Sequence, residues 1–275
     1  MPELPEVETV KRTLIPRITG KKITDVVINY ETMIKGISAE EFKNNLTGQH
    51  FLNIMRRGKY LIFELDDYYL LSHLRMEGKF FYGESEFSRE KHTHVEFKLE
   101  DEGSLKYEDV RKFGTFHLYA KGINLETTPS FKVLGLEPWD EVFDFVYVKN
   151  FLKGKKMPIK SMLLSQKLVT GLGNIYVDEV LFASKIHPLK ISGELTDGEI
   201  HNIIEHTQTI LAKAIEYKGT TIKTFTSSHG MTGEFQNFLK VHTKYGDKCQ
   251  DCQAIIVKTK VGGRGTYFCP VCQKN

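Results

Sequence analysis

The chain has 275 residues, of which 40% are hydrophobic and 27% are charged, and its formal charge at neutral pH is +3. This length is sufficient for two domains with separate cores, and the composition is that of an ordinary globular protein. No apolar run approaches the ~18 residues that a membrane span needs. The positive charge is concentrated near the end, because residues 235–275 contain seven lysines and arginines but only two aspartates. This imbalance indicates either a local contact with a polyanion or a solvated basic surface.

The first eight residues combine prolines with carboxylates, in the order Met1-Pro2-Glu3-Leu4-Pro5-Glu6-Val7-Glu8. They have none of the features of a secretory signal peptide. The simplest interpretation is a helix start, because proline suits the first turn and carboxylates suit the positive end of the helix dipole. A second interpretation requires removal of Met1. Pro2 would then be a secondary amine with a pKa of about 8, able to attack an electrophilic carbon and form an iminium.

The first part of the chain is predicted to be mostly β. Apolar residues at helical spacing predict one helix that ends near Gly20, and Ser38 to Glu41 form a capping box that opens a second. Alternating or apolar runs predict strands at 22–30, 60–65, 68–73 and 95–100. Two helices with many short strands over residues 1–135 favour a sandwich or barrel.

The second part is predicted to be mostly helical. Its expected helices cover residues 144–152, 159–167 and 175–184, and a long one begins at the capping box of Thr196 and Glu199. The segment Gly219–Gly233 is rich in Thr, Ser and Gly and is predicted to be a loop. We therefore expect an α+β chain with a β domain at 1–135, a linker at 136–150, a helical domain at 151–235 and a terminal hairpin at 236–275.

All four cysteines lie in the terminal hairpin, as Cys249-x-x-Cys252 and Cys269-x-x-Cys272 with sixteen residues between the pairs. This spacing is typical of a tetrahedral zinc site on a β-hairpin. Two disulfides are the alternative, but without a secretory signal we expect a reducing compartment. Four cysteine ligands leave no open position for a substrate, so the predicted zinc is structural.

Several turns carry polar residues that local structure does not require. They are Arg56-Arg57-Gly58-Lys59, His73-Leu-Arg-Met-Glu-Gly78, Asp109-Val-Arg-Lys-Phe-Gly114, Gly171-Leu-Gly-Asn-Ile-Tyr176 and the glycine-rich hairpin tip around Arg264. Cations and a helix-opening Gly-x-Gly suit phosphate contacts, and an exposed aromatic ring beside an arginine suits insertion into a DNA stack. Each turn alone is better explained as an ordinary solvated loop.

Together these stretches resemble bacterial formamidopyrimidine-DNA glycosylase. The resemblance runs from residue 2 to about residue 272, keeps the order of the motifs, and includes the four-cysteine hairpin. It implies a base-excision enzyme that acts on oxidised purines in duplex DNA and also cuts the backbone by β,δ-elimination. It also implies an N-terminal β-sandwich with flanking helices, a helix–two-turn–helix domain, a zinc finger, and a monomer in the bacterial cytoplasm, associated with the nucleoid.

The resemblance assigns roles to individual residues. Pro2 matches the nucleophile and Glu3 the acid/base, and Glu6 supports this terminus. Lys59 and Arg264 match phosphate-binding positions that complete the catalytic set. The further DNA-binding candidates are His73, Met76, Arg111, Phe113, Lys160 and Asn174, of which Met76, Arg111 and Phe113 match the side chains that fill the gap after base flipping. Contacts to the damaged base are expected from Glu77, Thr220, Thr221 and Thr224.

One departure from the family pattern is visible. The family usually has tyrosine-glycine after the segment that ends at Val241, whereas this chain has His242 and Thr243. Two other functions remain open. A relative of endonuclease VIII would act on oxidised pyrimidines. A chain that retains Met1 would be a non-catalytic DNA-binding module, because an amide nitrogen at Pro2 cannot form an iminium.

Overall fold

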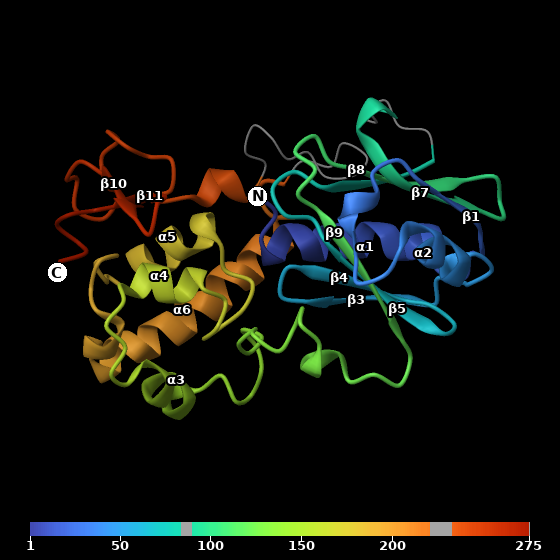
Figure 1. The fold of residues 1–275 in the computed structure, drawn as a ribbon. Coiled ribbons are helices and arrows are strands. Elements are labelled where there is room, and N and C mark those ends of the chain that lie inside the picture. The colour runs from blue at the N-terminus through green and yellow to red at the C-terminus, as the bar shows by residue number, and fades with distance from the viewer. Residues whose placement is uncertain (84–89, 221–232, 275) are drawn as a thin grey trace. The chain divides into compact units, whose positions relative to one another are not determined.

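The computed structural model describes residues 1–83, 90–220 and 233–274 (Figure 1). The chain divides into two compact units. The first comprises Met1–Leu125 and Tyr217–Glu234, and the second comprises Glu126–Glu216 and Phe235–Asn275. Residues 217–220, 233 and 234 therefore group with the β-rich unit in the structure. The domain ranges expected from the sequence remain predictions.

In its described residues, the first unit contains two α-helices and two sheets. The helices are α1 (Leu4–Ile18) and α2 (Ala39–Leu46). One sheet has the order β1-β7-β8-β6, with β1 at Ile23–Ile28, β7 at Thr93–Leu99, β8 at Ser104–Glu108 and β6 at Lys79–Tyr82. The other has the order β2-β9-β5-β4-β3, with β2 at Ile34–Lys35, β9 at Thr115–Ala120, β5 at Tyr68–His73, β4 at Tyr60–Glu64 and β3 at Asn53–Arg57. Only the β2–β9 pair is parallel among the described strands.

One hydrophobic core joins the two sheets and the helices of this unit. Phe63 on β4 meets Phe80 on β6 with ring centroids 5.4 Å apart, and Phe80 also meets Phe116 on β9 at 6.2 Å. These edge-to-face contacts connect the inner faces of the two sheets, as two packed sheets require. The predicted β-sandwich with flanking helices is confirmed.

Both helices of this unit begin as the sequence predicts. The Ser38 side chain accepts the backbone N–H of Glu41 at 3.1 Å, which caps α2. In α1 the residues Val7, Val10 and Leu14 are buried at helical spacing. Pro16 is tolerated inside the helix because α1 ends soon after it, with Gly20 at φ +84° in a conformation that favours glycine.

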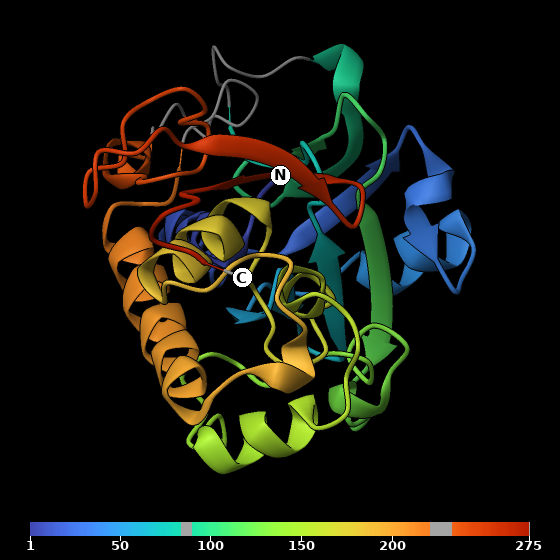
Figure 2. The same ribbon diagram turned by 90° about the vertical axis from the view of Figure 1, so that its left-hand side faces the viewer.

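The described part of the second unit contains four α-helices and a β-hairpin; Figure 2 views the molecule from the side on which this unit lies. Its elements are α3 (Phe145–Leu152), α4 (Ile159–Leu164), α5 (Asn174–Ala183), α6 (Asp197–Glu216), β10 (Val257–Val261) and β11 (Arg264–Phe268). Helix α5 packs against α4, α6 and β11, while α3 packs on α6. The predicted capping box is present, because Thr196 N donates to Glu199 at 2.8 Å and Glu199 N donates to the Thr196 hydroxyl at 3.3 Å.

Two details of this unit follow from local chemistry. The helix expected at 159–167 ends at Leu164, because Gln166 adopts φ +64° and cannot continue it. At the hairpin tip Gly262 and Gly263 have φ +54° and +76°, as a two-residue type I′ turn needs. Within the described part of the chain, no helix is long and apolar enough to cross a membrane.

Candidate active site and nucleic-acid interface

The buried carboxylate of Glu6 organises the start of the chain. Its Oε2 accepts the backbone N–H of Glu3 at 2.8 Å, and its Oε1 accepts the N–H and the hydroxyl of Thr220 at 2.7 and 3.1 Å. Gly219 has φ +78°, and a Cβ there would lie 2.5 Å from the same oxygen. The close approach therefore requires glycine. Glu6 thus joins the N-terminus to the beginning of the predicted lesion-contact loop.

Pro2 and Glu3 lie beside this carboxylate, and both are buried. Glu8, one turn further on, forms an ion pair with Arg56 at 3.1 Å. Burial alone would raise the pKa of Glu8, but hydrogen bonds from Lys11 and Arg12 lower it below its usual value. The terminus is therefore held on a helix whose first turns are packed and charge-compensated.

In the turn between β3 and β4, Arg56 and Lys59 are not solvated as the side chains of an ordinary surface turn would be. The Arg56 side chain is largely buried, and besides its ion pair with Glu8 it donates to the Gly58 carbonyl at 2.9 Å. Lys59 is also buried, with 7% of its surface exposed. Arg56 is thus held by contacts within the protein. Lys59, for which the resemblance implies a phosphate contact, is also largely enclosed by the protein.

His73 is a neutral buried histidine at the end of β5. Its Nδ1 accepts the backbone N–H of Arg75 at 3.0 Å, and its ring meets Tyr60 edge-to-face at 4.5 Å. Burial, with the nearby charges of Arg75 and Lys59, lowers the pKa of His73 from 6.5 to about 3. The structure therefore gives His73 a role in shaping the turn that carries Met76, and its DNA contact remains a prediction.

A second turn presents Arg111 and Phe113. Both are exposed, and the Arg111 guanidinium lies over the Phe113 ring at 4.8 Å. The buried Asp109 carboxylate shapes this turn, because it accepts the backbone N–H groups of Arg111, Phe113 and Gly114 at 2.8–2.9 Å. His94 donates to the Asp109 carbonyl at 2.8 Å. Our sequence analysis missed these supports, although an aspartate two residues before the arginine is the signal of an Asx-type turn.

In the second unit, two predicted phosphate ligands meet at the hairpin. Asn174 Nδ2 and Lys160 Nζ both donate to the Gly265 carbonyl, at 2.9 and 3.1 Å. Arg264, the preceding residue, is exposed at the start of β11. Lys160 has no exposed surface and forms an ion pair with Asp178 at 2.7 Å. Its ammonium therefore supports the hairpin tip, and a direct phosphate contact by Lys160 remains a prediction.

Asp178 and Glu179 are functional supports that sequence reasoning missed. The second oxygen of Asp178 accepts His242 Nδ1 at 2.7 Å. Glu179 accepts the backbone N–H groups of Lys240, Val241 and His242 at 2.8–3.0 Å. Burial raises the pKa of Glu179, and these hydrogen bonds oppose the rise. The two acids of α5 thus fix the segment that leads into the cysteine hairpin.

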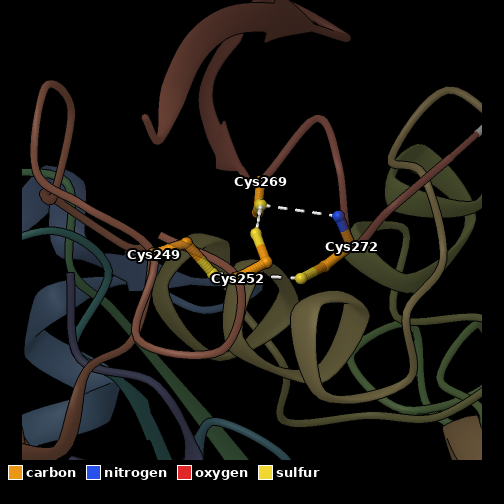
Figure 3. Close-up of side chains that lie close together, drawn as sticks. All are labelled: Cys249, Cys252, Cys269 and Cys272. Atoms are coloured by element: carbon orange, nitrogen blue, oxygen red, sulfur yellow. Dashed lines mark hydrogen bonds between the residues drawn. The ribbon is translucent and has the colours of Figure 1, made fainter. Parts of the chain in front are cut away.

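The four cysteines converge as predicted (Figure 3). Their sulfur atoms all lie within 4.8 Å of one another, with Cys249 and Cys272 3.9 Å apart and Cys252 and Cys269 3.4 Å apart. Four sulfurs at 2.3 Å from a tetrahedral zinc ion are separated by about 3.8 Å. None of the four forms a disulfide. The donor set therefore fits one structural zinc ion.

The predicted lesion contacts are described only in part. Glu77 is half-buried in the turn after β5. Thr220 is buried and bound to Glu6, so its side chain is already engaged at the terminus. Thr221 and Thr224 lie outside the described residues.

The low pKa of His73 predicts a loss of stability on acidification. The folded pKa of about 3 lies below the ordinary value of 6.5, so the unfolded chain takes up the proton first and the folded state is penalised as pH falls from 6.5 towards 3. Between pH 7 and pH 5 this residue should account for a loss of about 2 kcal/mol. Urea unfolding of wild type and His73→Gln at both pH values measures it. Equal losses in the two proteins would contradict the assignment.

The cysteine site predicts one zinc ion per chain. Cys249→Ser should lose the metal and weaken DNA binding through the hairpin, because three thiolates and a hydroxyl bind zinc less tightly than four thiolates. Elemental analysis and titration with a fluorescent duplex measure the two effects. Thr259→Ser in β10 is the matched control and should retain both. Stoichiometric zinc in Cys249→Ser would show that this cysteine is not a ligand.

Three family models together match most of the chain. Residues 1–116 match the formamidopyrimidine-DNA glycosylase N-terminal domain, residues 134–226 match the H2TH domain of that enzyme, and residues 246–275 match the zinc finger found in FPG and IleRS. The helix–two-turn–helix and zinc-finger assignments are therefore confirmed.

Full-length relatives agree with these matches. The chain is 48% identical to a formamidopyrimidine-DNA glycosylase of Bacillus cereus over 99% of both chains. It superposes with a TM-score of 0.92 and 48% identity on a Lactococcus lactis FPG variant bound to DNA that contains Fapy-dG, over 100% of both chains. Wild-type Lactococcus lactis FPG bound to DNA that contains an oxidised pyrimidine gives a TM-score of 0.91 at 47% identity, again over the whole of both chains. The chain belongs to the formamidopyrimidine-DNA glycosylase family.

Proposed function

We propose that this protein is a bifunctional DNA glycosylase and abasic-site lyase that removes formamidopyrimidines and 8-oxoguanine from duplex DNA. The observation that carries the proposal is the burial of Pro2 and Glu3, with the Glu3 backbone N–H bound to the Glu6 carboxylate at 2.8 Å, in a member of this family. A chain terminus is usually solvated and loosely held. Here Pro2 is buried beside the carboxylates of Glu3 and Glu6, which suits a catalytic amine at Pro2.

The chemistry requires a free amine at Pro2, and therefore loss of Met1. The amine attacks C1′ of the damaged nucleotide, and the base leaves as its bond to C1′ breaks. The amine then loses its proton, O4′ gains one and the C1′–O4′ bond opens, which leaves an iminium at C1′ that makes the C2′ hydrogens acidic. Removal of a C2′ proton expels the 3′ phosphate, and a second elimination expels the 5′ phosphate. Glu3 is the residue to which we assign the donation and acceptance of these protons. Hydrogen bonding of its backbone to Glu6 fixes its position beside Pro2.

Binding and base extrusion are assigned to side chains in both units. Lys59, Asn174 and Arg264 hold phosphates, and Lys160 and His73 act mainly through the hairpin tip and the Met76 turn that they support. Met76, Arg111 and Phe113 enter the space that the extruded nucleotide leaves. Flipping costs a few kcal/mol, which insertion and phosphate contacts offset. Glu77, Thr220, Thr221 and Thr224 contact the damaged base.

The zinc ion, when bound, closes the four-cysteine site and supplies no reacting group. The finger residues present Arg264 at the tip of a rigid turn. We further propose that the protein acts as a monomer in the bacterial cytoplasm, at the nucleoid.

The first test is covalent trapping of the protein on damaged DNA. Protein that lacks Met1 should form a borohydride-stable adduct with a duplex that contains 8-oxoguanine opposite cytosine, because reduction converts the iminium to an amine. Intact mass defines the terminus in each sample. Protein that retains Met1 is the matched control and should bind without an adduct. Absence of an adduct from the processed protein would refute the Pro2 mechanism and favour a binding module.

Glu3→Gln separates binding from chemistry. The amide keeps the size of the side chain but cannot transfer protons as a carboxyl does, so base removal should slow roughly 100-fold or more while duplex affinity stays the same. Single-turnover cleavage and equilibrium binding measure the two quantities. Wild-type turnover would exclude Glu3 as the acid/base.

Substrate preference distinguishes the alternative of an endonuclease VIII-type enzyme. The Lactococcus lactis complex with an oxidised pyrimidine makes this comparison necessary. Duplexes that contain 8-oxoguanine opposite cytosine or thymine glycol should be cut at different rates, with the oxidised purine faster. Faster cleavage of thymine glycol would assign this chain to oxidised pyrimidines.

A further inference from the structure

Tyr107 on β8 lies between the two turns that carry the candidate insertion residues. A Cβ at Gly78, after the Met76 turn, would lie 2.9 Å from Tyr107 Cζ, and a Cβ at Gly114, after Phe113, would lie 2.7 Å from the same atom. Both would overlap still more closely with the Tyr107 hydroxyl. Neither glycine has a left-handed φ. Both positions therefore require glycine, because the phenol of Tyr107 occupies the volume that a side chain at either position would need.

The ring of Tyr107 is fixed by the sandwich core. It stands opposite Phe80 in the β6–β8 register and meets Phe80 and Phe116 edge-to-face, at 5.1 and 4.9 Å. The turns on either side have their own supports, since Gly78 N donates to Leu74 O at 2.9 Å and Gly114 N donates to Asp109 at 2.8 Å. The Tyr107 ring is thus held in place by the core and lies between two turns, each of which has its own hydrogen bond.

The hydroxyl of Tyr107 contributes nothing evident to the stability of this state. The side chain has no exposed surface, and no described residue forms a hydrogen bond with its oxygen. Burial and the charge of Asp109 raise the pKa of Tyr107 well above its usual value, so the phenol keeps its proton. A buried donor without a partner is unfavourable, and phenylalanine would fill the same ring volume without that cost.

We propose that Tyr107 is a positioning residue that couples the Met76 turn to the Arg111–Phe113 turn, and that its hydroxyl gains a backbone carbonyl partner when the turns move onto DNA during base extrusion. This inference rests on the proposed function, which places Met76, Arg111 and Phe113 in the duplex. A hydrogen bond present only in the extruded state favours that state over the free protein. Tyr107 touches neither the lesion nor the reacting atoms.

Tyr107→Phe is the test, because it removes the oxygen and keeps the ring. The thermal midpoint should be unchanged or higher than that of wild type. Single-turnover excision of 8-oxoguanine from a duplex should slow roughly 2- to 10-fold, as expected for one hydrogen bond made only in the extruded state. Cleavage of a preformed abasic site in single-stranded DNA should be unchanged, because that substrate needs no insertion into a stack.

Tyr82→Phe is the matched control. Tyr82 lies on the neighbouring strand β6 and donates its hydroxyl to Asp101 at 2.7 Å, away from both turns. Its variant should lose stability and keep wild-type excision. Unchanged duplex excision in Tyr107→Phe, or equal slowing on duplex and single strand, would overturn the coupling role. Failure of wild type itself to excise or to form an adduct would instead overturn the proposed function.

Discussion

The hydrogen bonds of the buried Glu6 carboxylate hold together the parts of the candidate catalytic site. A carboxylate removed from water needs several donors, and Glu6 obtains them from the backbone of Glu3 and from both donors of Thr220. Since these residues are more than 200 positions apart in the chain, the terminus and the loop after Gly219 share one support. Loss of this carboxylate would leave several buried donors unpaired at once, so the hydrogen bonds of Glu6 hold the start of the chain in a defined position.

The same physical device shapes the other functional segments. Asp109 accepts three backbone N–H groups in the turn that carries Arg111 and Phe113. Glu179 accepts three in the segment 240–242, which leads into the cysteine hairpin. An ionised carboxylate suits this role because it has two acceptor oxygens and no donor that would clash with an N–H group. Irregular backbone that must present a side chain outward is thereby made rigid from within. The positions of the exposed Arg111 and Phe113 thus depend on Asp109, of which only 1% is exposed.

Much of this arrangement follows from local sequence signals, but the long-range partners do not. The capping boxes of α2 and α6 and the cysteine hairpin depend on residues a few positions apart, so periodicity and spacing predict them. The burial of Arg56 depends on Glu8, 48 positions away, and cations in a turn are ordinarily expected in solvent. Tyr107 illustrates the limit most clearly. Its place against Gly78 arises from the pairing of β8 with β6. Its place against Gly114 arises from the packing of the two sheets, in which the Tyr107 ring meets Phe116 on β9. No local pattern specifies either.

Asp178 holds His242, the residue at which the sequence departs from the tyrosine expected by resemblance. One oxygen of Asp178 binds Lys160 and the other binds His242, both at 2.7 Å, in a region that is almost completely buried. A buried ion pair that loses a partner leaves an uncompensated charge, at a cost of about 3–5 kcal/mol. With Nδ1 bound to Asp178, only Nε2 of His242 remains for another partner. His242 thus donates to an acid of α5, and the same acid binds Lys160, whose ammonium donates to the Gly265 carbonyl of the hairpin.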